Sequence, residues 1–259
     1  MVQRQARWGR RAALAALWCI WCLAPMPAQA ATYLPRVAGG AVTCAPVSVE
    51  GYGALIPEGP PTDRPAEAHA DLNLALRGYV RATAPAALIE LGGAADPRAP
   101  QLATLVGDGR TPALAAAYRV HDWDWGSNQR GAPLASPEVT LLGLRTAPGE
   151  PLYLPAAGYD LGGGYAALVL YASDDRLTVK YTREDNVVQG YTLHLENICV
   201  EPALLARYRQ LDQGGRQRLP ALRPGQALGR ARSTEVKAAI RDNGSFMDPR
   251  SRKDWWQER

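Results

Sequence analysis

The second half of the chain is a series of short apolar runs separated by Gly, Pro, Asp and Asn. Runs of this kind, bounded by turn-forming residues and rich in Val, Leu and Tyr, are typical of β-strands. The pattern therefore predicts a mainly β fold, with strands at residues 138–144, 151–155, 165–172, 176–182, 187–195, 225–231 and 235–241.

One segment of this half has the periodicity of a helix instead. Apolar side chains in residues 202–213 recur every three or four positions, and Pro202 suits the first turn of a helix. Further on, Asn243-Gly244 joins two short runs. A two-residue type I′ turn needs positive φ at both positions, which Asn and Gly tolerate, so residues 238–249 are predicted to form a β-hairpin.

The first half of the chain is less regular. Residues 31–65 are rich in Pro and Gly and are expected to be extended, with one or two short strands. Leucines at alternate positions in residues 66–81 favour a strand over a helix. Residues 82–113 are predicted to be a surface excursion, and residues 111–125 to rejoin the sheet.

The first 30 residues have the three parts of a secretory signal peptide. Four arginines precede an apolar run at residues 12–26, and Ala28 and Ala30 supply a small-x-small cleavage pattern. The run is too short between its flanks for a dependable membrane span. We therefore expect cleavage after Ala30, export to the periplasm, cell surface or medium, and a mature chain with no stable membrane span.

Charge changes its meaning once this leader is set aside. The whole chain has 29 Lys and Arg and 25 Asp and Glu, a formal charge of +4. Four of the basic residues and none of the acidic ones lie in the leader, so 25 of each sign remain. The excess belongs to targeting, and we predict no nucleic-acid partner.

Two cysteines remain after the leader, Cys44 and Cys199. In an exported protein such a pair favours a disulfide, and the alternative is two unpaired buried thiols. A bridge across 155 residues would stabilise the fold by roughly 4–5 kcal/mol in chain-entropy models, less any strain.

Three later segments follow one another: APGEPLYLPAAG at 147–158, GYTLHL at 190–195, and PGQALGRA with TEVKAAIRDNGSFMDP at 224–249. Their order and spacing resemble the strand pair, the Tyr-x-His-Leu strand and the closing hairpin of lysostaphin/LytM-type zinc metalloendopeptidases. The resemblance covers residues 118–250. It implies a barrel-sandwich of antiparallel sheets (duplicated hybrid motif-like) with one short helix, and binding or cleavage of peptidoglycan cross-link peptides.

The departures from that family concern its zinc site, which needs three protein ligands and one position for water. The resemblance places Leu141 and Arg145 at the family's first His and Asp, and Glu235 and Lys237 at two further histidines. Only His194 matches a family functional position, that of the His that assists the attacking water. The alternative for His194 is a strand histidine with no catalytic role. We predict no cofactor and no metal.

The run His121-Asp122-Trp123-Asp124-Trp125 has the most unusual composition in the chain. On a strand its two Trp lie on one face and its two Asp on the other. Exposed Trp rings stack on sugars, and paired carboxylates bind calcium or exchange protons. The alternative is an aromatic plug at the end of a barrel, with the aspartates in turns.

Two smaller features leave alternatives open. His69 and Asp71 share a strand face and are a possible metal pair, for which the sequence supplies no third ligand. Trp255 and Trp256, near the C-terminus, either fold back on the body or present an aromatic patch to a wall polymer.

Together these patterns predict a signal peptide (1–30), an N-terminal β segment (31–117), a LytM-like β domain (118–250) and a tail (251–259). The expected function is non-catalytic, either binding or regulatory, at the bacterial cell envelope. The expected ligand is a peptide or glycan strand of peptidoglycan, or another envelope polymer, held in a groove floored by Arg145, Glu235 and Lys237. One alternative is an active hydrolase, either a zinc peptidase with His69, His121 and His194 as ligands or a glycan-cleaving enzyme with Asp122 and Asp124. The other is a purely structural exported domain.

Overall fold

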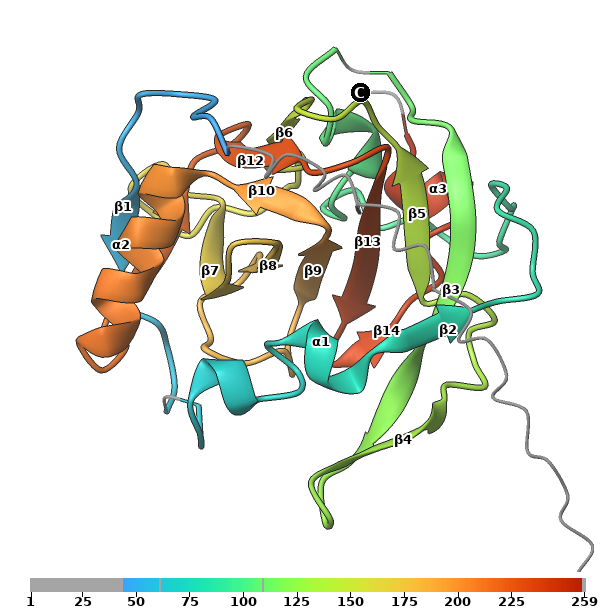
Figure 1. Ribbon diagram of the computed structural model, residues 1–259, viewed down its shortest axis with the longest axis horizontal. Coiled ribbons are helices and arrows are strands. Elements are labelled where there is room, and N and C mark those ends of the chain that lie inside the picture. The colour runs from blue at the N-terminus through green and yellow to red at the C-terminus, as the bar shows by residue number, and fades with distance from the viewer. Residues whose placement is uncertain (1–43, 61, 109, 258–259) are drawn as a thin grey trace, which may run out of the picture. The chain divides into compact units, whose positions relative to one another are not determined.

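The computed structural model describes residues 44–60, 62–108 and 110–257, all within one compact unit, Gly40–Arg259. The predicted signal peptide and the predicted cleavage site lie outside these residues. The described part is mainly β, as predicted, and its named strands pair antiparallel (Figure 1).

The larger sheet has the strand order β1-β11-β7-β8-β9-β13-β5-β3-β2, with β14 paired to β13 and β4 to β3. It does not close into a barrel within the described residues, because β1 and β2 stand at opposite ends of this order. Its strands are β1 (Gly53–Leu55), β2 (Tyr79–Arg81), β3 (Leu114–Asp124), β4 (Gln129–Pro133), β5 (Leu141–Arg145), β7 (Ala167–Ala172), β8 (Arg176–Lys180), β9 (Tyr191–Glu196), β11 (Leu219–Leu222), β13 (Glu235–Asp242) and β14 (Ser245–Phe246).

A smaller sheet joins β10 (Ile198–Val200), β12 (Ala227–Ala231) and β6 (Pro151–Tyr153). Cys199 in β10 forms a disulfide with Cys44, which lies before β1 and outside the strands, so the smaller sheet is bonded to the segment that leads into β1. The predicted pairing of these two cysteines is therefore confirmed.

The predicted helix and hairpin are both present. Helix α2 (Pro202–Gln213) begins at Pro202 and buries Leu204, Leu205 and Tyr208. At the hairpin turn Asn243 and Gly244 have φ of 45° and 82°, the positive values that a type I′ turn requires.

Two predictions for the first half of the chain are wrong. Residues 66–81 form a 3-10 helix, η1 (Ala66–Ala68), a single helical turn, α1 (Leu74–Arg77), and only then a strand, β2. The side chain of Asn73 accepts a hydrogen bond from the Ala75 amide and begins α1, which overrides the alternating leucines. Residues 82–113 are in part core, since Leu102, Leu105 and Val106 around η2 (Leu102–Thr104) are buried.

The C-terminal segment packs on the body, one of the two arrangements considered from the sequence. In α3 (Arg252–Trp255) and just after it, Trp255 and Trp256 are both buried. Their indole N–H groups donate to the carbonyls of Asp248 and Pro249, so each large ring is buried with its polar atom paired.

Candidate functional site

One face of the central strands carries polar side chains although it lies inside the molecule. Side chains alternate along a strand, so every second residue of β8, β9 and β13 shares this face. In the register of the sheet, Glu196 lies between Arg176 and Lys237, and His194 lies between Thr178 and Ala239. The polar members of this face are Arg176, Thr178, Lys180, Thr192, His194, Glu196, Glu235, Lys237 and Arg241.

The segment that contains η1 and α1 divides this face in two. Figure 1 shows α1 crossing in front of the ends of β9 and β13. The Thr178 hydroxyl donates to the Leu72 carbonyl at 2.6 Å, and Leu74 packs with Ala239 and Leu141. We call the buried part beneath this segment the covered patch; it consists of Thr178, Lys180, Thr192, His194 and Arg241.

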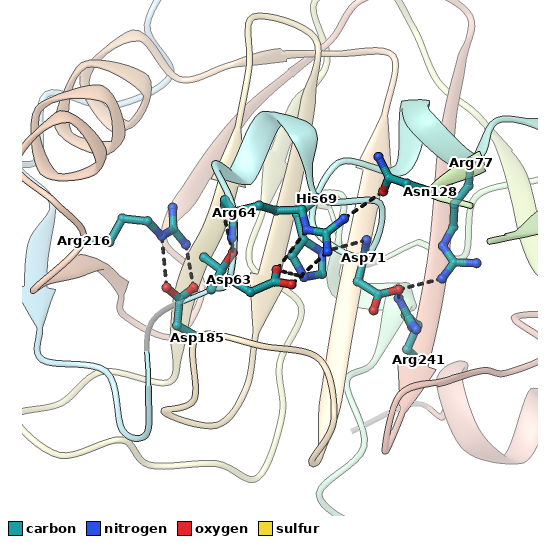
Figure 2. A network of polar contacts seen from close by, with 10 residues as sticks. Asp63, Arg64, His69, Asp71, Arg77, Asn128, Asp185, Arg216 and Arg241 are labelled. Carbon is teal, nitrogen blue, oxygen red and sulfur yellow. Dashed lines mark hydrogen bonds and ion pairs between the residues drawn. The ribbon is translucent and has the colours of Figure 1, made fainter. Parts of the chain in front are cut away.

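The segment is fixed to the covered patch by charge. Figure 2 shows Asp71 between two arginines, and its Oδ1 lies 2.7 Å from nitrogens of both Arg77 and Arg241. Burial alone would raise the pKa of Asp71, but the charges and hydrogen bonds of the two arginines together lower it. Asp71 is thus an ionised carboxylate that joins the covering segment to β13.

His194 lies at the centre of the covered patch and is fully buried. Its Nδ1 lies 3.0 Å from the Thr178 hydroxyl, which already donates to Leu72, so the imidazole Nδ1–H is the donor between them. Its Nε2 is then an acceptor, and it has no hydrogen-bond partner among the described residues. Burial, followed by the charge of Arg241, lowers the pKa of His194 to about 3, so the ring is neutral.

Two more polar atoms of the covered patch lack hydrogen-bond partners in the described part of the chain: Lys180 Nζ and Thr192 Oγ1. Burial lowers the pKa of Lys180 to about 8. The covered patch is therefore polar and buried, and three of its polar atoms have no hydrogen-bond partner in the described part of the chain.

The other part of the face is half-exposed, and we call it the open strip; it consists of Tyr79, Tyr118, Arg176, Glu196, Glu235 and Lys237. The Lys237 ammonium lies 3.4 Å from the Glu235 carboxylate and over the rings of Tyr79 and Tyr118, at 5.7 and 5.5 Å from their centres. The Tyr118 hydroxyl donates to Glu235 at 2.7 Å. Burial, and then this bond to Glu235, raises the pKa of Tyr118 to about 12.

Glu196 is the most buried member of the open strip, at 5% exposure. Burial raises its pKa to about 7, although the charges of Arg176, 3.3 Å away, and of Lys237 oppose this. A carboxyl group with a pKa near neutrality can both accept and give up a proton under physiological conditions.

The residues at the positions that the family resemblance assigns to zinc ligands are not arranged as a zinc site. Glu235 and Lys237 face Arg145 and Gly143 across the β13–β5 pair, and Arg145 is exposed. Leu141 packs in an apolar cluster with Leu74 and Phe246. Among the described residues, no three or more His, Cys, Asp or Glu side chains are grouped so that they could hold a metal ion.

The His-Asp-Trp-Asp-Trp run lies in the β3–β4 hairpin. Asp122 is exposed, and its carboxylate lies 3.7 Å from Arg77. Asp124, the last residue of β3, accepts hydrogen bonds from Gly126 and Ser127 in the turn that follows. Trp125 is 43% exposed and contacts the rings of Trp123, at 6.4 Å, and His69, at 5.2 Å.

His69 and Asp71 do not form a pair of ligands. The His69 Nδ1 accepts a hydrogen bond from the Asp71 amide, while the Asp71 carboxylate is bound to the two arginines. His69, His121 and His194 each have different neighbours, namely Trp125, the Gly131 carbonyl and Thr178.

Sequence reasoning missed Tyr79, Tyr118, Arg176 and Glu196. Glu196 had a usable signal, because it follows His194 by two positions in a strand and so must share its face. Tyr79, Tyr118 and Arg176 come from strands whose order in the sheet the sequence does not reveal.

No helix in the described residues is long and apolar enough to cross a membrane. No protein-family model matches the sequence, and no curated protein matches it.

Proposed function

We propose that this protein is an exported, non-catalytic module of the bacterial cell envelope that binds a peptide or glycan strand of peptidoglycan along the open strip. The observation that carries the proposal is the strip itself. It brings two tyrosine rings and charges of both signs to one half-exposed face of a rigid sheet.

Such a surface suits a ligand that has both apolar and charged groups. Tyrosine rings offer flat apolar faces to a sugar or an alkyl chain. Lys237, Glu235 and Arg176 can pair with the carboxylates and amines of a wall peptide. The ladder of β8, β9, β13 and β5 fixes their backbone positions, and the ion pairs Lys237–Glu235 and Arg176–Glu196 already restrict their side chains, so less side-chain entropy would be lost on binding.

We propose that the module is non-catalytic because of the residues at the positions that the family resemblance assigns to zinc ligands. There the Lys237 ammonium, the Glu235 carboxylate and the Tyr118 hydroxyl satisfy one another. A cation already lies where a metal ion would have to bind, and Leu141 is occupied in apolar packing.

A binding assay with purified peptidoglycan sacculi tests this proposal on the chain from residue 31 to 259. We expect the wild type to sediment with sacculi, and K237Q and Y118F to bind about tenfold more weakly, the effect of losing one hot-spot contact. R209Q is a matched control, because Arg209 is an exposed cation on α2. Wild-type protein that stays in the supernatant, or strip variants that bind like R209Q, would contradict the proposal.

Glu196 favours a second candidate, a cell-wall hydrolase that uses this carboxyl group as its proton donor or acceptor. Its pKa of about 7 and its place beside Lys237 are what that chemistry requires. Release of soluble fragments from labelled sacculi by the wild type, abolished in E196Q, would establish it. If the wild type binds sacculi and releases nothing, the binding module stands.

A further inference from the structure

The contacts of Arg77 and Arg241 leave part of each guanidinium unused. A guanidinium carries five N–H groups. Arg77 donates to the carbonyls of Ala70 and His121 and to Asp71, and Arg241 donates to Asp71 and twice to the carbonyl of Gly244. Five less three leaves two N–H groups on each arginine without an assigned acceptor in the described residues.

Both arginines line the same cavity, of about 190 Å³. It lies between α1, the end of β3 and the β13–β14 hairpin, and it opens beside the covered patch. Asp122 stands at its mouth, 68% exposed, whereas the two arginine side chains are only 5% and 6% exposed. The polar and aromatic groups around it are Arg77, Asp122, Ser136, Arg241, Ser245 and Phe246.

The inner wall of this cavity has an excess of positive charge. Two guanidinium groups share one oxygen of the Asp71 carboxylate there, and the Asp122 carboxylate lies 3.7 Å from Arg77 at the exposed mouth. In the same covered patch as Arg241, Lys180 is buried with no hydrogen-bond partner for its Nζ in the described part of the chain, and burial, together with the charge of Arg241 and against that of Glu184, lowers its pKa. Uncompensated buried charge is costly, so an anion in the cavity would be favourable.

The volume and the lining of the cavity limit which anions would fit. Its volume is below the range of about 300–1,000 Å³ common for whole small-molecule ligands, so it fits a small molecule or one end of a larger one. The Phe246 ring lies against both guanidinium groups, at 5.7 and 4.6 Å, and forms an apolar wall. Asp122 at the mouth repels further negative charge and accepts hydrogen bonds.

We propose that this cavity binds a small carboxylate with an N–H group on its α-carbon, that is, a free amino acid or the C-terminal residue of a peptide. The free N–H groups of Arg77 and Arg241 would hold the carboxylate, since the guanidinium fork matches its two oxygens. Ser136 and Ser245 would supply hydroxyls, and Asp122 would accept from the ligand N–H. The site is separate from the open strip and does not depend on its function.

Isothermal titration of the chain from residue 31 to 259 tests the ligand class, with alanine, N-acetylalanine, alaninamide and inorganic phosphate at equal ionic strength. We expect binding of alanine or N-acetylalanine and at least tenfold weaker binding of alaninamide, which lacks the carboxylate. Tighter binding of alanine identifies a free amino acid, and tighter binding of N-acetylalanine identifies a peptide C-terminus. Binding of phosphate as tight as either, or binding of none of the four, overturns the proposal.

Two variants at the mouth test the site without removing a buried charge. S245V places methyl groups in the cavity and is expected to weaken carboxylate binding about tenfold. D122N is expected to weaken alanine about tenfold and N-acetylalanine less, because only alanine offers an ammonium. D174N, which changes an exposed aspartate in the β7–β8 turn, is the control. Equal affinities in all three variants and the wild type would overturn the assignment to this cavity.

Discussion

The covered patch and the open strip are two parts of one sheet face, built on the same strands, and they differ in what lies over them. His194 and Glu196 show the difference best, since they are two positions apart on β9. Burial favours the neutral form of both groups: it lowers the pKa of His194 to about 3 and raises that of Glu196 to about 7. At physiological pH His194 in the covered patch therefore stays neutral, whereas Glu196 in the open strip titrates near neutrality.

The largest effect is expected from removing the carboxylate that closes the covered patch. In D71A two buried arginines lose their shared partner, and breaking a buried ion pair in this way costs about 3–5 kcal/mol. Urea unfolding at pH 7 measures the loss. D63A is the control, because Asp63 is an exposed partner of Arg64 in the same segment. If D71A and D63A lose the same amount of stability, Asp71 does not hold the segment down.

A smaller effect is expected in the open strip, where stability should depend on pH through Glu196. The folded-state pKa of Glu196 is raised, so its contribution to stability is complete below its unfolded value of 4.5 and is lost as pH rises to about 7. The loss amounts to up to about 3 kcal/mol. E196Q should therefore gain stability relative to the wild type on going from pH 5 to pH 8. Parallel melting curves for the two proteins across this range would contradict the shift.

His194 should act in the opposite direction. Its folded-state pKa is lowered, so its contribution is present above the unfolded value of 6.5 and is lost as pH falls toward about 3. Between pH 7 and pH 5 this costs about 2 kcal/mol. In H194N this part of the acid sensitivity should be absent, whereas H121N should keep it. Unfolding free energies of H194N and H121N at pH 5 and pH 7 decide the matter.

The smallest effect separates structure from binding in the open strip. Y118F removes one hydrogen bond to Glu235, and a single partly exposed bond of this kind contributes about 1 kcal/mol. Y118F should therefore melt only slightly below the wild type while it loses affinity for sacculi. A large loss of stability would show that Tyr118 belongs to the core, and its binding defect would then carry no information on the strip.

The sequence predicted features that are local. The strands from residue 138 onward, helix α2 and the Asn243-Gly244 hairpin depend on patterns within a few residues of each other. The disulfide was predictable because only two cysteines follow residue 30. Segment 66–81 was assigned wrongly because the cap at Asn73 overrides its alternating leucines.

The candidate site was only partly predictable, for a related reason. The positions of Glu235 and Lys237 followed from the family resemblance, but their partners Tyr79 and Tyr118 lie more than 100 residues earlier in the chain. Asp71 and Arg241 are 170 residues apart. Neither pairing leaves a mark in the order of residues, because the first arises from the strand order of the sheet and the second from the packing of the covering segment on β13.

The disulfide also decides how the molecule carries mechanical load. A pull applied between the segment before Cys44 and the C-terminus passes through the sulfur–sulfur bond into β10 and bypasses the intervening loop. Residues 45–198 stay slack under that tension, and they include the whole covering segment, Tyr79, Tyr118 and Glu196. Stretched between two anchorage points, the oxidised chain would carry no direct tension through this part, whereas the reduced chain would expose it to the force.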